Sequence, residues 1–336
     1  MTSAPKVLVA GGAGYLGSLL VPHLLERGYE VTVVDLLWFG NHLPAGVRLL
    51  EKDVLALTGD EVAGHDQAVF LAGVSNDPMA EYSPSANFVY NGAAPAYLAY
   101  LARRAGVRRF VYGSSCSIYG YSTDALCAED EPTVCHYPYG ISKLQGERAC
   151  LQLGDEEMSV ISLRKGTICG WSPRMRLDLV INTMFRTALA EGRIVVRNPA
   201  IWRPVLAIRD AVAAYVRALE AAPDVSGVFN VASDNYTVGE LGDRVKEAVE
   251  ARLGDRIDLR ILDEHDLRSY KVSTDKATRV LGFRPRHDVL SIVDELFEHL
   301  PEFEDFDNPL YSNIEVFKRL DEGPAGARRA VEPALG

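Results

Sequence analysis

The sequence predicts an α/β protein built around a doubly wound parallel sheet, and three observations support this class. Short apolar runs alternate with helical segments over roughly the first 170 residues. The first run ends in a glycine-rich turn that opens a helix, and later runs end in small or polar residues, as strands do at a ligand-binding sheet edge. We therefore expect the sheet in residues 1–172 and a smaller substrate-binding lobe in 173–322, with some segments of the lobe returning to the sheet.

The composition excludes several classes of protein. The chain has 336 residues, 48% hydrophobic and 24% charged, which suits one large globular domain or two smaller ones. A net charge of -11 argues against nucleic-acid or anionic-membrane partners, because both need basic patches. No apolar run is long enough to span a membrane and no signal peptide is recognisable, so a cytoplasmic location is predicted. The five cysteines form no C-x-x-C pair, and we expect neither a bound metal nor a disulfide framework.

The glycine-rich turn points to a dinucleotide. Residues 6–10 read as a strand and 18–26 as an amphipathic helix, with Gly11, Gly14 and Gly17 between them. Glycines at this spacing allow a tight turn, close approach of the backbone to a pyrophosphate, and close packing of helix on strand. We interpret this segment as a Rossmann unit.

The next strand supplies a candidate ribose ligand. Residues 30–34 form it, and Asp35 follows 18 residues beyond Gly17 (35 − 17), where dinucleotide folds place a carboxylate. Residues 36–39 contain no Arg or Lys that could hold a 2′-phosphate. Repulsion from Asp35 therefore favours NAD over NADP.

The other expected elements follow from hydrophobic periodicity. Strands are expected at 47–50, 67–71, 110–113, 160–164, 194–196, 203–207 and 228–231, and helices at 85–105, 179–191, 210–221 and 238–253. Pro95 should kink the first of these helices. The segment from Gly323 onward reads as a mobile tail.

Tyr139 and Lys143 are four residues apart, so a helix would place them on one face, one turn apart. A phenol is a poor base at neutral pH, but a neighbouring ammonium favours its phenolate. A chance pair on a surface helix is the ordinary interpretation of this motif. Ser115, at the end of a predicted strand 24 residues earlier (139 − 115), favours the catalytic one.

Taken together, these motifs make the chain resemble the extended short-chain dehydrogenases/reductases of the nucleotide-sugar epimerase and dehydratase group, over about residues 6–300. The resemblance rests on Gly-Gly-Ala-Gly-Tyr-Leu-Gly at 11–17, Asp35, Asp53-Val54, Leu71-Ala72-Gly73, Asn91, Ser-Ser-Cys-Ser-Ile-Tyr-Gly at 114–120, Tyr139 with Lys143, the stretch 203–210 and Leu-Gly-Phe-Arg-Pro at 281–285. It implies that Ser115 hydrogen-bonds the substrate hydroxyl or ketone, that Tyr139 is the acid/base, and that Lys143 binds the nicotinamide ribose and tunes Tyr139.

The resemblance also implies the ligand contacts and the assembly. The residues expected to bind NAD are Gly11, Gly14, Tyr15, Leu16, Gly17, Asp35, Asp53, Val54, Leu71, Ala72, Gly73, Asn91, Tyr139 and Lys143. The residues expected to contact a nucleotide-sugar substrate are Ser75, Asn76, Ser117, Thr167, Asn182, Arg203, Arg268 and Tyr270, the last two in the segment 266–270. The family's pairing of the helices at about 85–105 and 139–154 implies a homodimer.

Three departures from the family pattern narrow the function. The family's 4,6-dehydratases carry an Asp-Glu pair after the catalytic hydroxyl residue, whereas this chain has Cys116-Ser117, which disfavours a dehydratase. Cys116 is either a reactive thiol or a small residue packed behind the active-site strand. Asp263 stands where many relatives carry an Arg, so Arg268 is expected to bind the diphosphate, and residues 165–167 are also atypical.

The favoured function is a sugar-nucleotide C4 epimerase that recycles its NAD through a keto-sugar intermediate. A reductase of 4-keto sugars or a decarboxylase of the same family are the alternatives among enzymes. A catalytically silent NAD-binding regulatory protein is the alternative from a different class.

Overall fold

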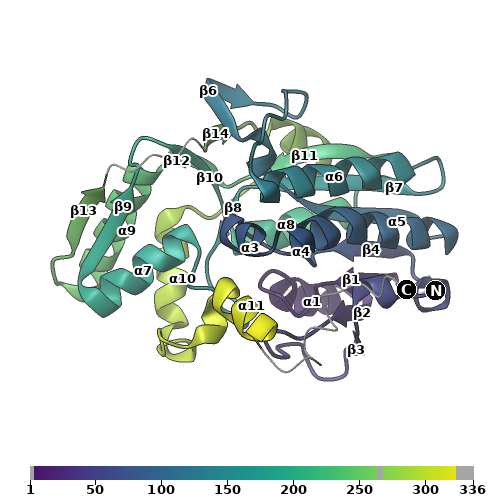
Figure 1. Cartoon of the computed structure of the whole chain (residues 1–336), viewed down its shortest axis with the longest axis horizontal. Helices are drawn as coiled ribbons and strands as arrows, with labels where there is room; N and C mark the ends of the chain where they lie inside the picture. Colours follow the sequence, from purple (N-terminus) through teal and green to yellow (C-terminus); the bar gives the residue numbers. More distant parts are fainter. Residues whose placement is uncertain (1–3, 263–267, 323–336) are drawn as a thin grey trace.

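A computed structural model describes residues 4–262 and 268–322, and its centre is a seven-stranded parallel sheet (Figure 1). The strands lie in the order β11-β7-β5-β4-β1-β2-β3. Their bounds are β1 Lys6–Ala10, β2 Glu30–Asp35, β3 Arg48–Glu51, β4 Gln67–Phe70, β5 Arg109–Ser115, β7 Ser159–Lys165 and β11 Gly227–Val231. The predicted doubly wound sheet is confirmed, with β11 joining it from the second half of the chain.

Helices cover both faces of this sheet because its strands are apolar on both sides. Val7 and Val9 of β1 pack with α1 (Gly17–Glu26) and α8 (Ile208–Leu219). Leu8 and Ala10 point to the opposite face, where α2 (Gly59–Val62), α3 (Asp77–Tyr82), α4 (Pro84–Phe88), α5 (Ala94–Arg104) and α6 (Pro138–Leu153) contribute to the core. The alternation of side chains along each strand thus builds two cores, one on each side of the sheet.

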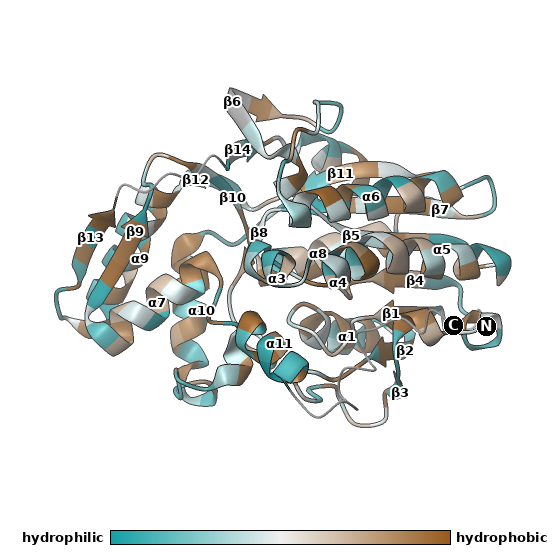
Figure 2. Cartoon of the chain, in the orientation of Figure 1, coloured by the Kyte–Doolittle hydropathy of each residue, from teal (hydrophilic) through white to brown (hydrophobic). Residues whose placement is uncertain are grey.

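The remaining elements form a second lobe and a small two-stranded sheet (Figures 1 and 2). The lobe contains β8 (Thr167–Cys169), β10 (Trp202–Ala207), β12 (Asp234–Thr237), β9 (Arg193–Arg197), β13 (Asp258–Leu262), α7 (Val180–Glu191), α9 (Val238–Leu253) and α10 (Val289–Glu298), with their own apolar core. The small sheet pairs β6 (Tyr121–Cys127) with β14 (Ser269–Val272). The last helix, α11 (Asn313–Glu322), lies between the lobe and the large sheet (Figure 1).

Several elements differ from the sequence prediction. The helix expected at 85–105 is interrupted by a π-helical turn, Val89–Ala93, and Pro95 falls in the first turn of α5, where its missing N–H costs little. Strands β6, β8, β12, β13 and β14 and helices α2, α3, α10 and α11 were not predicted. Most are short or lack a clean period, so tertiary packing rather than local pattern defines them.

The tail from Gly323, and the sequence predictions made for Asp263 and residue 266, lie outside the described residues. Within the described part of the chain, no helix is long and apolar enough to cross a membrane.

Candidate active site

The glycine turn after β1 is shaped for close contact with a ligand. Gly11 has φ +81, and a Cβ there would lie less than 3 Å from the backbone of Ala72. A Cβ on Gly17 would likewise meet the carbonyl groups of the turn itself. Only glycine fits these two positions, so the backbone here can approach an anionic diphosphate at the start of α1.

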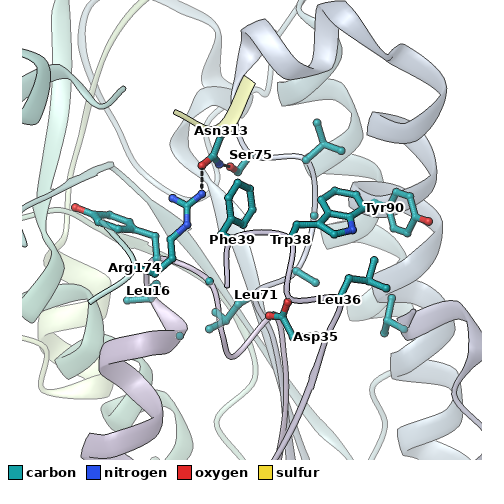
Figure 3. A pocket seen from close by; sticks show the side chains of 18 of the residues that line it. Leu16, Asp35, Leu36, Trp38, Phe39, Leu71, Ser75, Tyr90, Arg174 and Asn313 are labelled. Carbon is teal, nitrogen blue, oxygen red and sulfur yellow. Dashed lines mark hydrogen bonds between the residues drawn. The ribbon is translucent and has the colours of Figure 1, made fainter. Parts of the chain in front are cut away.

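A cavity opens at the carboxyl edge of the sheet, above this turn (Figure 3). Eleven of the residues predicted to bind NAD line it: Gly11, Gly14, Tyr15, Leu16, Gly17, Asp35, Asp53, Val54, Leu71, Ala72 and Gly73. Asn91 does not: its side chain is buried and donates to Val74 O at 2.8 Å, beneath the Gly73 loop. Asn91 therefore supports the cavity wall and does not face the cofactor.

Asp35 is held at the end of β2 by backbone donors. Its carboxylate accepts hydrogen bonds from Ala13 N at 3.0 Å and Leu37 N at 2.9 Å. Burial raises the pKa of Asp35, while these donors and the charge of Arg174 act in the opposite direction. A carboxylate fixed at this position suits the ribose hydroxyls of NAD and repels a 2′-phosphate.

Arg174 and Arg176 enter the same cavity from the loop after β8, and sequence analysis missed both. The guanidinium of Arg174 lies over the ring of Phe39 at 3.6 Å and donates to Asn313 Oδ1 (Figure 3). Its Nε is buried without a hydrogen-bond partner among the described residues. Burial, followed by the charge of Arg176, lowers the pKa of Arg174 to about 9. A buried guanidinium with an unused donor fits an anionic diphosphate, and the position of these arginines directly after a strand's carboxyl end was the available signal.

Helix α11 covers part of this cavity. Asn313, at its start, lines the cavity and donates to Ser75 Oγ at 2.6 Å. Phe317 packs against Trp38, with ring centroids 5.8 Å apart, and against Tyr82 at 6.0 Å. The C-terminal helix thereby encloses the side of the cavity formed by the residues after Asp35.

A second cavity adjoins the first and contains the predicted catalytic groups. Ser115, at the end of β5, and Tyr139, in the first turn of α6, both line it. Gly140 allows this close approach, because a Cβ there would lie 2.9 Å from Ser117 O. Burial raises the pKa of Tyr139 to about 12, while a hydrogen bond with Ser115 and the charge of Arg176 lower it. The surrounding protein alone therefore favours the protonated form of Tyr139, which lies beside the hydroxyl predicted to share its substrate.

Lys143 lies one turn farther along α6 but lines neither cavity. Its Nζ donates to Gly113 O at 2.9 Å and lies 5.2 Å from the centroid of the Tyr112 ring. Burial, followed by the charge of Lys165, lowers the pKa of Lys143 well below its usual value. The charge of Arg176 also acts on Tyr139 and lowers its pKa.

Most predicted substrate residues line the second cavity: Ser75, Asn76, Ser117, Thr167, Arg203, Arg268 and Tyr270. Arg268 pairs with Asp77 at 2.6 Å and lies over the ring of Tyr137 at 5.3 Å. Asn182 is the exception, because it is fully buried and donates to Arg176 O at 2.7 Å and Gly170 O at 3.0 Å. It braces the loop that carries the arginines and does not line the second cavity.

Cys116 is packed, not reactive. Its side chain is fully buried behind β5, and its thiol donates to Arg164 O at 3.1 Å. Burial raises the pKa of this thiol, which opposes formation of the nucleophilic thiolate. Among the described residues, no group of histidines, cysteines or carboxylates could hold a metal ion.

The two cavities meet at five residues and so form one continuous site for a dinucleotide and a second ligand. A family model described as "NAD dependent epimerase/dehydratase family" matches residues 7–232. The chain belongs to this family. Membership confirms the resemblance found in the sequence, and with it NAD as the cofactor and an enzyme of the epimerase or dehydratase type.

Individual relatives agree with this placement. The chain is 29% identical to UDP-glucose 4-epimerase 3 of Oryza sativa subsp. japonica, over 84% of this chain and 86% of that protein. It is 28% identical to the UDP-glucose 4-epimerase of Corynebacterium glutamicum, over 86% and 94%. Among solved structures, MoeE5 in complex with UDP-glucuronic acid and NAD superposes with a TM-score of 0.77 at 28% identity, covering 87% of this chain and 98% of MoeE5.

Proposed function

We propose that the protein is an NAD-dependent sugar-nucleotide 4-epimerase. The observation that carries this proposal is the meeting of the two cavities. Tyr139 and Ser115 line the substrate cavity, which joins the NAD cavity at Tyr15, Ser75, Lys165, Ile168 and Arg176. A sugar bound beside Tyr139 would thus lie against the nicotinamide end of the cofactor. Bound NAD would accept a hydride from the sugar carbon and then return it.

The chain's own residues divide the other tasks. The glycine turn, Asp35 and Arg174 would hold NAD. Ser115 would hydrogen-bond the sugar hydroxyl and later the ketone. Tyr139 would act as a phenolate, which the positive charge of the bound oxidised nicotinamide favours, and its oxygen would receive the hydroxyl proton and give it back. Arg203 and Arg268, at the far wall of the substrate cavity, would bind the diphosphate.

The geometry favours epimerisation over elimination of water. The family's 4,6-dehydratases carry carboxylates directly after the catalytic hydroxyl residue, whereas the two positions after Ser115 hold Cys116, which is buried, and Ser117, which lines the substrate cavity. Two carboxylates do line the substrate cavity, but Asp77 is paired with Arg268 and Asp178 with Arg176. Neither is placed as a free acid or base.

The position of α11 over the NAD cavity favours an enzyme that does not release its cofactor between turnovers. A reductase must exchange its nicotinamide at every turnover. Here the contacts of Asn313 and Phe317 close α11 over the NAD cavity, and these contacts would have to open each time. An epimerase regenerates its own NAD within the cycle, so such closure costs it nothing.

The substrate assignment can be tested with UDP-glucose, UDP-galactose and the corresponding UDP-pentoses and UDP-uronic acids. We expect the protein to convert one member of a C4 pair into the same mixture from either side, without added NADH. The products should be read by NMR, which reports the configuration at C4. A product that has lost water or carbon dioxide, or a reaction that consumes NADH stoichiometrically, would contradict epimerisation.

We also propose a homodimer formed through α5 and α6. Tyr100 of α5 is 44% exposed, and Phe88, the last residue of α4, is 37% exposed, so both offer apolar surface. Light scattering during gel filtration should give twice the chain mass. Tyr100→Glu should give a monomer, whereas Tyr121→Glu, at a tyrosine of β6 that is 53% exposed, should leave the dimer intact. A wild-type monomer at micromolar concentration would refute the dimer.

The two parts of the chain would have different roles, in a cytoplasmic enzyme. Residues 1–172 would provide the NAD-binding body and 173–322 the substrate lobe, with α8 and β11 returning to the large sheet. A cytoplasmic location is supported by the five cysteines, which are all unpaired, as expected in a reducing compartment.

A further inference from the structure

Lys165 is a cation at the point where the two cavities meet. It ends β7, next to Ser115 of β5, and it lines both the NAD cavity and the substrate cavity. Its Nζ lies beside Gly113, where an added Cβ would be 3.0 Å from it. Because NAD and the sugar must meet here for hydride transfer, this ammonium would lie beside the nicotinamide end of bound NAD.

The charge of Lys165 is not neutralised by the protein around it. Among the described residues, we find no hydrogen bond or ion pair to its Nζ, and burial lowers its pKa to about 8. The other cation that lines both cavities, Arg176, is paired with Asp178 at 2.8 Å. Two hydroxyl groups nearby, Ser114 Oγ and Tyr215 OH, are buried and have no hydrogen-bond partner among the described residues. This end of the site therefore has polar groups available to a ligand.

A second lysine adds to the same field. Lys143 approaches from α6 to bond Gly113 O, and the charge of Lys165 helps to lower its pKa. The two lysines repel each other, and the carboxylates that line the substrate cavity, Asp77 and Asp178, are already paired with arginines. A neutral ring placed next to them is tolerated better than a cationic one.

We propose that Lys165 sets the redox balance of the bound nicotinamide, because its ammonium favours the neutral reduced ring over the cationic oxidised ring. In the forward half-reaction the sugar carbon loses a hydride to the nicotinamide and is oxidised to a ketone, while its hydroxyl proton goes to the phenolate of Tyr139. The nicotinamide loses its positive charge in this step, so repulsion from Lys165 is relieved. The return step restores the positive charge of the nicotinamide and the repulsion from Lys165. Lys165 thus acts on the cofactor through its charge and does not itself transfer a proton.

The test is the midpoint potential of the bound cofactor in the full-length holoprotein, measured by dye equilibration at 340 nm and pH 7. A charge acting in a partly buried site with an effective dielectric near about 20 is expected to shift the NADH-to-NAD affinity ratio by roughly 10- to 100-fold. Lys165→Met should therefore lower the potential by about 30 to 60 mV, since tenfold corresponds to about 30 mV for a two-electron couple. Lys165→Arg, which keeps the charge, should stay close to wild type.

Lys52→Met is the matched control. Lys52 also lines the NAD cavity, but it is paired with Glu61 at 2.9 Å, so its removal should change the potential by less than a third as much. Lys165→Gln provides a second neutral variant in case Lys165→Met folds poorly. The proposal would be overturned if the midpoint potential were unchanged in both neutral variants. It would also be overturned if Lys165→Arg lowered the potential as much as the neutral variants do. The inference rests on NAD binding but not on the 4-epimerase assignment, and no sugar is present, so either proposal can fail without the other.

Discussion

Replacing Tyr139 with phenylalanine should lower the turnover of the nucleotide-sugar substrate by about 10²- to 10⁴-fold, the usual contribution of a general acid/base group. The substitution keeps the ring that packs at the start of α6 and removes the hydroxyl beside Ser115. Ser115 alone cannot replace it, since its own hydroxyl has no neighbouring base. The substrate proton then has no acceptor within the cavity, and the loss should appear in kcat more than in KM.

NAD content provides the control for this variant. The NAD cavity is formed by the glycine turn, Asp35 and the arginine loop, and Tyr139 does not line it. Tyr139→Phe should therefore retain NAD at the wild-type level, as read from the absorbance of the denatured supernatant. Tyr97→Phe, which removes a hydroxyl that donates to Leu57 O away from both cavities, should keep turnover within about threefold of wild type. Near wild-type turnover in Tyr139→Phe would mean that the catalytic acid/base lies elsewhere.

Replacing Glu147 with alanine should lower the free energy of unfolding by about 3 to 5 kcal/mol, the usual cost of removing one partner from a buried ion pair. Glu147 lies on α6, two turns beyond Tyr139, and is 1% exposed. Its carboxylate accepts from Arg164 Nη2 at 2.7 Å and Nε at 3.1 Å and from Ser162 Oγ at 2.9 Å. Without Glu147, the guanidinium of Arg164 stays buried between α6 and β7 with its charge uncompensated.

Denaturant unfolding of two further variants separates the ion pair from ordinary side-chain loss. Glu30→Ala removes a glutamate that pairs with Lys6 at the surface, where the side chains are 60% and 46% exposed, and it should cost less than about 1 kcal/mol. The double change Glu147→Leu with Arg164→Met replaces both charges by apolar groups and should be milder than Glu147→Ala. If Glu147→Ala lowered the free energy of unfolding no more than Glu30→Ala does, the Glu147–Arg164 pair would contribute nothing to the stability of the catalytic helix.

The sequence by itself determined the parts of this protein that depend on local pattern. The continuous apolar runs of β1 and β2, the glycines of the turn, and the 3.6-residue period of α9 are properties of a few neighbouring residues, so they can be read directly. The same holds for Asp35 at the end of β2 and for Ser115 at the end of β5, because the carboxyl ends of parallel strands share one edge of the sheet. These regularities predicted both the fold and the residues that line most of the site.

Only the tertiary structure decided which charges meet in that site. Arg174 is 139 positions from Asn313 in sequence, and the packing of α11 over the large sheet brings them together. Asn182 and Asn91, which the family resemblance assigned to ligands, donate instead to carbonyl groups of the loops they support. Burial and charges from distant segments also set the pKa values of Tyr139 and Lys165. Side-chain direction and electrostatic environment depend on residues far apart in the chain, and no local period encodes them.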